Sequence, residues 1–306
     1  MKKLLLIDAN SLIHRAFHAL PPMTTASGEP SQAIYGVARI LLKLWREERP
    51  EFAAALFDRP EPTFRDKIYK EYKGHRPPAP NELISQLIEI HNLFPLFGIK
   101  TFELAGFEAD DLIATFAEKF KKEKDIQITI FTGDLDSLQL VDGKKITVRV
   151  PQKGISETTI YDPVAVEARY GLPPEKLPDY KALVGDASDN IKGVSGIGPK
   201  TAAKMLKNYK NLEELFGAPD LEPEFAKKLL PHKAQAFLSK KLVTLIKDAP
   251  IEVKNLEALK TSADTVGLEQ YFESKGFASL LKQIREPAVP KPEKKKEPKA
   301  PQGSLF

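Results

Sequence analysis

Three short apolar segments of this sequence each run into acidic residues, and this pattern restricts the fold more than any other feature. Apolar runs this short, rich in strand formers, are typical of strands buried on both faces of a parallel sheet. Parallel strands bring their carboxyl ends to one edge of the sheet, where such folds bind ligands. The segments and the acids that follow them are Leu4–Ile7 with Asp8, Ala53–Phe57 with Asp58, and Ile126–Phe131 with Asp134 and Asp136.

Helical patterns separate these segments. They cover residues Ser31–Glu48, Asn81–Phe97 and Glu108–Lys122. The alternation predicts an α/β fold, with a mostly parallel central sheet flanked by helices. A further strand near Ile146–Val150 is expected at an edge of the sheet, and from about Pro163 the pattern becomes helical.

The expected organisation has three parts. Residues 1–162 form the α/β domain, residues 163–285 form a helical region, and residues 286–306 form a disordered tail rich in Pro, Lys and Glu. The net charge is +4, and the tail holds an excess of lysine. If the clustered acids bind metal ions, the remaining surface is strongly basic and suits a polyanionic partner.

Composition excludes some classes of protein. There are no cysteines, which excludes disulfides and thiolate zinc sites and suits a reducing cytosol. The apolar run near Met1 is too short for a secretory signal, and no stretch approaches the ~20 apolar residues of a membrane span. We therefore expect a protein that makes no contact with membranes.

Two more acidic segments add to the strand-end acids. Glu108-Ala109-Asp110-Asp111 opens a predicted helix, and Gly185-Asp186-Ala187-Ser188-Asp189-Asn190 follows an apolar helix. Helix capping explains one such acid alone, and a turn or a calcium loop explains another, although no glutamate follows at the calcium-loop distance. Many carboxylates in one place, however, repel one another unless cations neutralise them. Oxygen donors without Cys or His nearby favour Mg²⁺ or Mn²⁺ over Zn²⁺.

A glycine-rich segment, Gly193–Thr201, precedes a short helical run. Glycine permits a tight hairpin, and Pro199 suits the first turn of a helix. Backbone N–H groups at that helix start, together with Lys200 and Lys204, would hold a phosphate. The pattern is typical of a helix-hairpin-helix that binds duplex DNA without reading its sequence, and a plain interhelical turn is the alternative.

Arg59–Arg76 is a second basic segment, in which aromatic residues are interleaved with cations. Such mixing suits single-stranded DNA, because bases stack on aromatic rings while cations neutralise phosphates. The alternative is a solvated basic helix whose aromatic residues lie in the core.

Six blocks of the sequence closely resemble the 5′ nuclease domain of bacterial DNA polymerase I, within the flap endonuclease family. The blocks span about residues 1–285 and are Leu6–Ser11, Arg15–Ala19, Tyr72–Arg76, Gly106–Asp111, Gly185–Asn190 and Gly196–Gly198. The resemblance implies a PIN-like 5′ nuclease fold, with a helical arch at about residues 63–98 and a helix-hairpin-helix at residues 193–207. It also implies a 5′→3′ exonuclease and 5′-flap endonuclease that acts in replication and repair, in the bacterial cytoplasm at the nucleoid.

The same resemblance implies roles for individual residues. Two or more Mg²⁺ ions, or Mn²⁺, would bind nine acids: Asp8, Asp58, Glu108, Asp110 and Asp111 at the first ion, and Asp134, Asp136, Asp186 and Asp189 at the second. Catalysis would rest on Lys73, Arg76, Asp110 and Asp134. DNA contacts are implied at Arg15, Arg65, Tyr72, Lys73, Arg76, Gly196, Ile197, Gly198, Lys200, Thr201 and Lys204. The partner would be branched or flapped duplex DNA with a 5′ single strand, K⁺ is a candidate ion at the hairpin, and we expect a monomer.

The last residues resemble the short peptides by which bacterial proteins bind the sliding clamp. Gln302, Leu305 and Phe306 would be the anchors, on a flexible Pro/Lys tether. An arbitrary C-terminus is the alternative. A polymerase I would continue into a polymerase domain, so this chain is expected to be either a free-standing 5′ nuclease, which a polymerase on a separate chain would fit, or a fragment. Two other functions stay open: a scaffold that holds branched DNA without cutting it, and a PIN-like ribonuclease.

Overall fold

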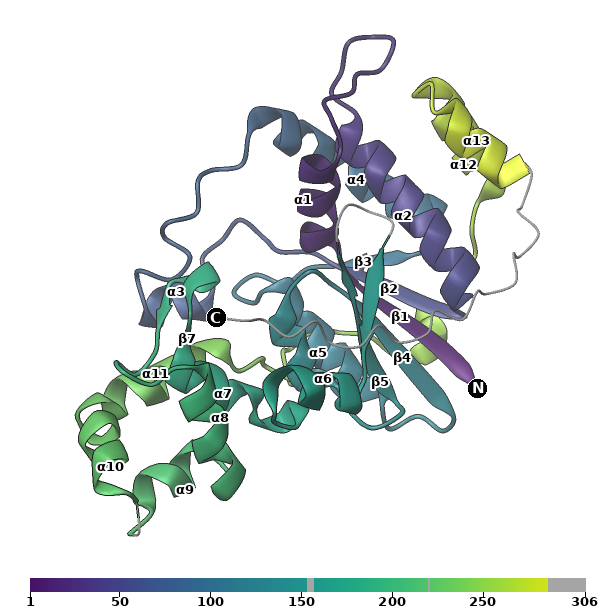
Figure 1. The fold of residues 1–306 in the computed structure, drawn as a ribbon. Helices are drawn as coiled ribbons and strands as arrows, with labels where there is room; N and C mark the ends of the chain where they lie inside the picture. Colours follow the sequence, from purple (N-terminus) through teal and green to yellow (C-terminus); the bar gives the residue numbers. More distant parts are fainter. Residues whose placement is uncertain (153–156, 220, 286–306) are drawn as a thin grey trace, which may run out of the picture.

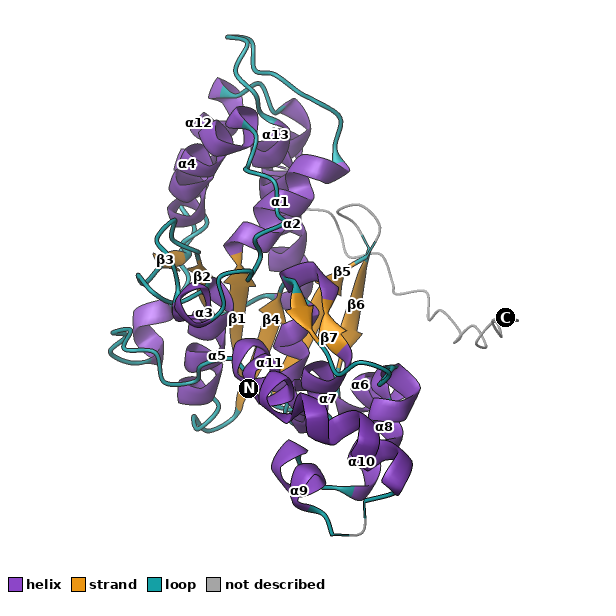
Figure 2. Ribbon diagram, turned by 90° about the vertical axis from the view of Figure 1, so that its left-hand side faces the viewer, coloured by secondary structure: helices purple, strands orange, loops and turns teal. Residues whose placement is uncertain are grey.

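A six-stranded sheet forms the centre of the molecule (Figures 1 and 2). The computed structural model describes residues 1–152, 157–219 and 221–285. Across the sheet the strands are β3 (Lys100–Phe102), β2 (Phe52–Leu56), β1 (Lys2–Asp8), β4 (Ile126–Phe131), β5 (Ile146–Pro151) and β6 (Thr158–Tyr161). The first five run parallel, and only β6 is antiparallel to its neighbour. The predicted α/β fold with a mostly parallel central sheet is confirmed.

The central strand β1 illustrates why these segments form buried strands. Successive side chains of a strand point to opposite faces of the sheet. Leu4 and Leu6 therefore enter the core on one face, while Leu5 and Ile7 enter the core on the other. A segment that is apolar at every position can satisfy both faces only inside a sheet that is covered on both sides.

Helices cover both faces of the sheet. One face packs against α5 (Ala109–Phe120) and the 3₁₀ segment Leu256–Leu259. The other face is covered by α1 (Ala9–Ala19), α2 (Gln32–Glu48), α4 (Asn81–Leu96), α12 (Thr265–Ser274) and α13 (Ala278–Arg285). The predicted helices at residues 31–48, 81–97 and 108–122 correspond to α2, α4 and α5, whereas α1, β3 and β6 were not predicted.

A smaller helical region has a core of its own, which lies below the sheet in Figure 2. Its helices are α7 (Leu177–Val184), α8 (Pro199–Asn208), α9 (Leu212–Gly217), α10 (Pro223–Leu229) and α11 (Lys233–Val243). Helix α6 (Pro163–Tyr170) leads into it from the sheet, with short 3₁₀ segments at Leu135–Leu140, Pro174–Lys176, Ala187–Asp189 and Leu230–His232. After α11 the chain leaves this core, since Leu245, Leu256 and Phe272 belong to the cores that pack against the sheet.

Two further expectations need correction. Strand β5 is not at the edge of the sheet, because β6 pairs with its outer side. The predicted helical arch is helical only at its ends, in α3 (Phe64–Ile68) and α4, while residues 69–80 form turns and extended chain. The prolines at positions 77, 78 and 80 explain the break, since proline lacks a backbone donor and restricts the residue before it. Within the described residues, the helices are too short or too polar to cross a membrane.

Candidate active site

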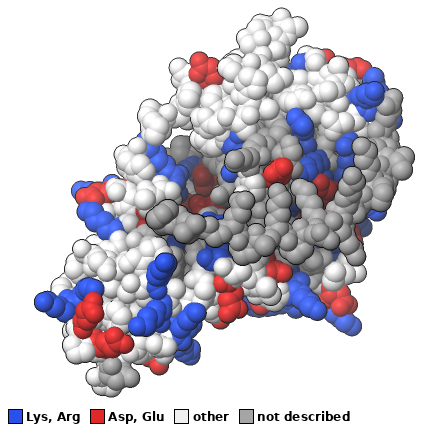
Figure 3. Space-filling view, in the orientation of Figure 1, with Lys and Arg blue, Asp and Glu red and all other residues white. Residues whose placement is uncertain are grey.

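A cleft of about 860 Å³ opens at the carboxyl ends of the parallel strands. Side chains from the sheet, from the segment between α3 and α4, and from the loop after α7 line it. Six of the nine predicted metal ligands lie along this cleft: Asp8, Asp58, Glu108, Asp110, Asp134 and Asp186. Figure 3 shows acidic side chains inside a hollow with basic side chains around it. The convergence expected from the strand order is therefore present.

Asp8 is the last residue of β1 and also caps helix α1. Its carboxylate accepts hydrogen bonds from the backbone N–H of Ser11 at 2.9 Å and from the hydroxyl of Thr132 at 2.7 Å. Burial and the neighbouring charge of Asp58 raise the pKa of Asp8 to about 7. Asp8 thus caps helix α1 and also lines the cleft.

Asp58 and Asp110 face the same space from β2 and α5. Asp58 accepts a hydrogen bond from the backbone N–H of Ala109 at 2.7 Å, which ties the end of β2 to the start of α5. Asp110, in the first turn of α5, accepts a hydrogen bond from the Ser137 hydroxyl at 3.2 Å. Burial, and then the charge of Asp134, raise the pKa of Asp110 well above its usual value. Burial likewise raises the pKa of Asp134.

Asp111 and Arg65 were predicted to bind a metal ion and a phosphate, and the structure assigns them another role. Arg65 is 1% exposed and grips Asp111 with two hydrogen bonds of 2.7 and 2.8 Å. Its Nε atom donates to the carbonyl oxygen of Leu242 at 2.7 Å, and Asp111 is fully buried. The pair therefore joins α3, α5 and α11 behind the cleft, where neither side chain can reach a ligand.

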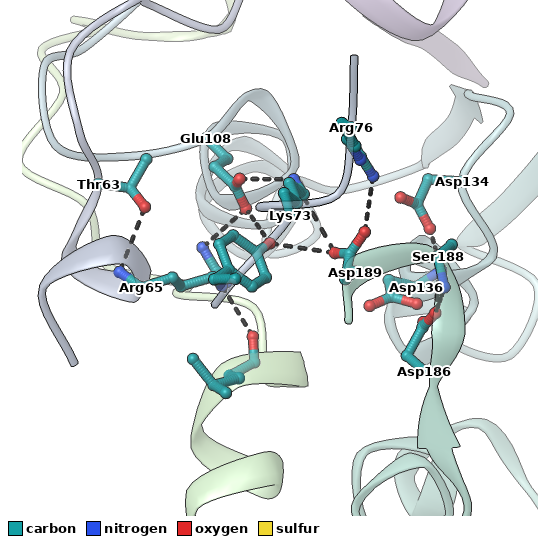
Figure 4. Close-up of polar contacts among 12 residues, drawn as sticks. Thr63, Arg65, Lys73, Arg76, Glu108, Asp134, Asp136, Asp186, Ser188 and Asp189 are labelled. Carbon is teal, nitrogen blue, oxygen red and sulfur yellow. Dashed lines mark hydrogen bonds and ion pairs between the residues drawn. The ribbon is translucent and has the colours of Figure 1, made fainter. Parts of the chain in front are cut away.

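Glu108 lies among cationic and phenolic groups (Figure 4). Its carboxylate accepts hydrogen bonds from Lys73 at 2.5 Å and from the Tyr72 hydroxyl at 2.9 Å, and it lies 3.1 Å from Arg65. Burial still raises the pKa of Glu108. Tyr72 is 6% exposed and its ring belongs to a small core with Leu242, so the predicted DNA contact by this side chain is not supported.

The remaining acids are held by cations from the helical region and the arch segment. Lys181 on α7 forms ion pairs with both Asp136 and Asp186. Arg76 donates to Asp189 at 2.6 Å (Figure 4). Burial opposes ionisation of Asp186, but its ion pair with Lys181 outweighs burial and lowers the pKa of this carboxyl. Lys181 was missed from the sequence, although a lysine just before an acidic loop is a usable signal.

The carboxylates of the cleft are of a kind that suits hard divalent cations, but they do not lie close enough together to form a finished metal site. In the described part of the chain, no three acidic or histidine side chains converge closely enough to hold a metal ion. Carboxylates that share a site repel one another unless cations neutralise them, and here Lys73 and Lys181 act as counter-ions to four of the acids. The oxygen-only donors that line the cleft are nevertheless those that Mg²⁺ and Mn²⁺ prefer.

The predicted hairpin follows α7 closely. A side-chain carbon at Gly193 would meet the carbonyl of Val184 at 2.4 Å, so only glycine fits there. Gly196 adopts a positive φ of 77°, which again favours glycine. Ile197 is 5% exposed, and its backbone N–H donates to the carbonyl oxygen of Val194, so its side chain and N–H group anchor the hairpin.

The other predicted hairpin residues lie at the surface of this turn. Gly198, Lys200 and Lys204 are exposed and Thr201 is half-buried, at the N-terminal end of α8. Pro199 occupies the first helical position, as predicted. The start of α8 thus combines free backbone N–H groups with exposed lysines, the groups that a phosphate contact requires.

Arg15 lies on α1 beside a second hollow of about 520 Å³, next to the main cleft. Its guanidinium donates to the carbonyl oxygen of Gln152 at 2.5 Å. His14 and His18, which line both hollows, were not singled out from the sequence, although their spacing of four residues places them on one helix face. The predicted clamp residues Gln302, Leu305 and Phe306 lie outside the described residues.

Known proteins are similar to this chain in both sequence and fold. The family profile described as 5'-3' exonuclease, N-terminal resolvase-like domain, matches residues 3–171, and the profile described as 5'-3' exonuclease, C-terminal SAM fold, matches residues 172–265. The chain is 38% identical to the 5'-3' exonuclease of Aquifex aeolicus, over 93% of this chain and 96% of that one. It is 40% identical to DNA polymerase I of Bacillus subtilis, but covers only 32% of that protein's length.

Solved structures support the same fold. The flap endonuclease D15 of bacteriophage T5, described as a complex with DNA and metal ions, matches with a TM-score of 0.65 at 20% identity over 93% of this chain and 98% of that chain. T5 5'-exonuclease with bound zinc matches with a TM-score of 0.67 at 21% identity, over 80% of this chain and 90% of that chain. An α/β sheet with an acid-lined cleft and an attached helical hairpin defines the 5′ nuclease fold class. The chain belongs to the 5'-3' exonuclease family, whose members are hydrolases that act on DNA.

Proposed function

We propose that this protein is a structure-specific 5′→3′ exonuclease and 5′-flap endonuclease that acts in replication and repair. The observation that carries the proposal is the single cleft in which six acids from distant parts of the chain face Lys73 and Arg76. Family membership supports hydrolysis of DNA, and the acid cleft supports dependence on divalent cations.

Asp8, Asp58 and Asp110 are the residues we expect to hold the first ion, together with Glu108 once its carboxylate releases Lys73. Asp134, Asp136, Asp186 and Asp189 are the corresponding set for the second. Divalent cations bound there would activate a water molecule and neutralise charge on the phosphate and the leaving oxygen. Closing these sets requires side-chain movements, since Lys73 and Lys181 now pair with the acids.

Lys73 and Arg76 would stabilise the reacting phosphate. Both cations already line the cleft, paired with Glu108 and Asp189 respectively. A phosphate that enters the cleft offers them a second anionic partner, and positive charge held beside a developing negative charge lowers the reaction barrier. The positive φ of Lys73, 51°, keeps this residue in a tight turn that projects into the cleft.

The exposed hairpin would bind the duplex part of the substrate and fix its distance from the cleft. Gly196, Gly198, Lys200, Thr201 and Lys204 would contact the phosphate backbone, with K⁺ as a candidate ion at this turn. Contacts of this kind carry no sequence information, so specificity would come from the shape of the DNA. Branched or flapped DNA with a 5′ single strand is the substrate that suits both the cleft and the hairpin.

The test is cleavage of an end-labelled 5′-flap duplex in Mg²⁺ and in EDTA, beside a matched substrate whose flap is RNA. We expect Mg²⁺-dependent cutting of the DNA flap near the junction. DNA binding without cutting would favour the scaffold alternative. Preferential cutting of the RNA flap would favour a ribonuclease.

A further inference from the structure

Helix α10 lies against the hairpin of the helical region. The methylenes of Lys228 come within 3.8 and 4.0 Å of the position that a side chain would take at Gly196. On the same helix, the ring of Phe225 lies 5.6 Å below the ammonium of Lys204. Helix α10 therefore borders both the tip of the hairpin and helix α8, and it places Lys228 next to the hairpin.

One acidic residue, Glu224, lies among these lysines. Glu224 lies one turn before Lys228 and accepts a hydrogen bond from its ammonium at 2.8 Å. The pair is open to solvent, with side chains 38% exposed for Lys228 and 74% exposed for Glu224. Lys228 lowers the pKa of Glu224, and Lys204 contributes in the same direction. Figure 3 shows basic and acidic side chains mixed over this part of the molecule.

We propose that Lys228 is a further phosphate contact of the hairpin, and that Glu224 occupies Lys228 until duplex DNA replaces it. The inference rests on the proposed DNA-binding role of the hairpin. A DNA phosphate and the Glu224 carboxylate are both anions and compete for one ammonium group. Because an exposed ion pair is worth little, DNA can displace Glu224 at small cost, whereas the new phosphate contact releases a counterion.

The test is binding of the full chain to a fluorescently labelled plain duplex in EDTA, measured over a range of KCl concentrations. Lys228→Ala should weaken binding about three- to ten-fold and reduce the slope of log K against log salt by about 0.9. Glu224→Gln should tighten binding about two- to five-fold, because it frees Lys228 and removes repulsion of the phosphates. If the ion pair only stabilised the fold, both substitutions should change DNA affinity in the same direction, so opposite effects on affinity point to a direct contact of Lys228 with DNA.

The pair formed by Glu118 and Lys121 is a matched control. It has the same 2.8 Å separation, its side chains are 30% exposed for Lys121 and 31% exposed for Glu118, and it lies at the far end of α5, away from the cleft. Glu118→Gln and Lys121→Ala make the same charge changes and should leave affinity and salt slope near those of wild type. The inference is overturned if Glu224→Gln behaves like Glu118→Gln, or if Lys228→Ala keeps the wild-type slope. Failure of the wild-type chain to bind the duplex would instead overturn the hairpin's proposed role as well.

Discussion

The acids in and beside the cleft form two groups that differ in how their charge is balanced. Asp8 and Asp110 are held by hydroxyl and backbone donors, and burial beside other carboxylates raises the pKa of both. Asp136 and Asp186 are instead bridged by Lys181, and the pKa of Asp186 is lowered. The first group thus lacks the neutralising charge that a divalent cation would supply. The second group must release Lys181 before its carboxylates can bind a divalent cation.

The largest expected effect tests this difference directly. Asp8→Asn should reduce the single-turnover rate of 5′-flap cleavage in Mg²⁺ by about 10³-fold, because it removes charge from the group that has no internal cation. Asp186→Asn should cost only about ten-fold and should raise the Mg²⁺ concentration needed for half the maximal rate. Equal losses from the two variants would show that the groups do not differ in function.

The next effect concerns the buried pair behind the first group. Arg65→Ala leaves Asp111 buried without its partner, and it should lower the free energy of unfolding by about 3–5 kcal/mol in a denaturant titration. Replacing both residues together, Arg65→Met with Asp111→Leu, should recover much of that loss. A loss below about 1 kcal/mol for Arg65→Ala would mean that the pair is not the support described here.

A smaller effect should appear in the pH dependence of stability. The folded pKa of Asp8 is about 7 against 3.8 for the ordinary group, so the folded state holds a proton that the unfolded chain has released. This contribution destabilises the metal-free protein as pH rises through that window. Saturating Mg²⁺ should therefore raise Tm by several degrees at about pH 8, and by less at about pH 5.5, where the ion must displace protons. Thermal unfolding in EDTA and Mg²⁺ measures this, and an equal shift at both pH values would contradict it.

The smallest effect comes from the hairpin, which lies apart from both acid groups. Lys200→Ala should weaken duplex binding a few-fold without altering the Mg²⁺ dependence of cleavage at saturating protein. Lys144→Ala, at an exposed position in the loop before β5, is the control. A changed Mg²⁺ dependence in Lys200→Ala would show that the hairpin influences the acid groups.

Local features of the sequence were enough to predict much of the fold. The strand segment Leu4–Ile7 is apolar at every position, so its burial on both faces follows from composition, while Ile126–Phe131 is interrupted only by Gln127 and Thr129. The acids after them then converge because parallel strands end at one edge. The prediction that the arch is helical was wrong for an equally local reason. The prolines at positions 77, 78 and 80 disfavour a continuous helix there.

The division of the acids could not be predicted in this way. Asp110 and Asp111 are adjacent in sequence, yet one faces the cleft and the other is buried against Arg65. The partners that decide this are distant in sequence, as the bond from Arg65 to the carbonyl of Leu242 illustrates with a separation of 177 residues. The pairing of Lys181 with Asp136 likewise depends on how the helical region packs against the sheet.

The central claim is that acids of the cleft carry Mg²⁺-dependent cutting while other surfaces bind the DNA. The most direct measurement compares wild type with Asp110→Ala and Asp134→Ala on the same 5′-flap duplex, following both cleavage in Mg²⁺ and binding in EDTA. The account predicts that both variants lose cleavage and keep DNA affinity close to that of wild type. Cleavage at the wild-type rate by either variant would contradict the assignment of this cleft as the active site.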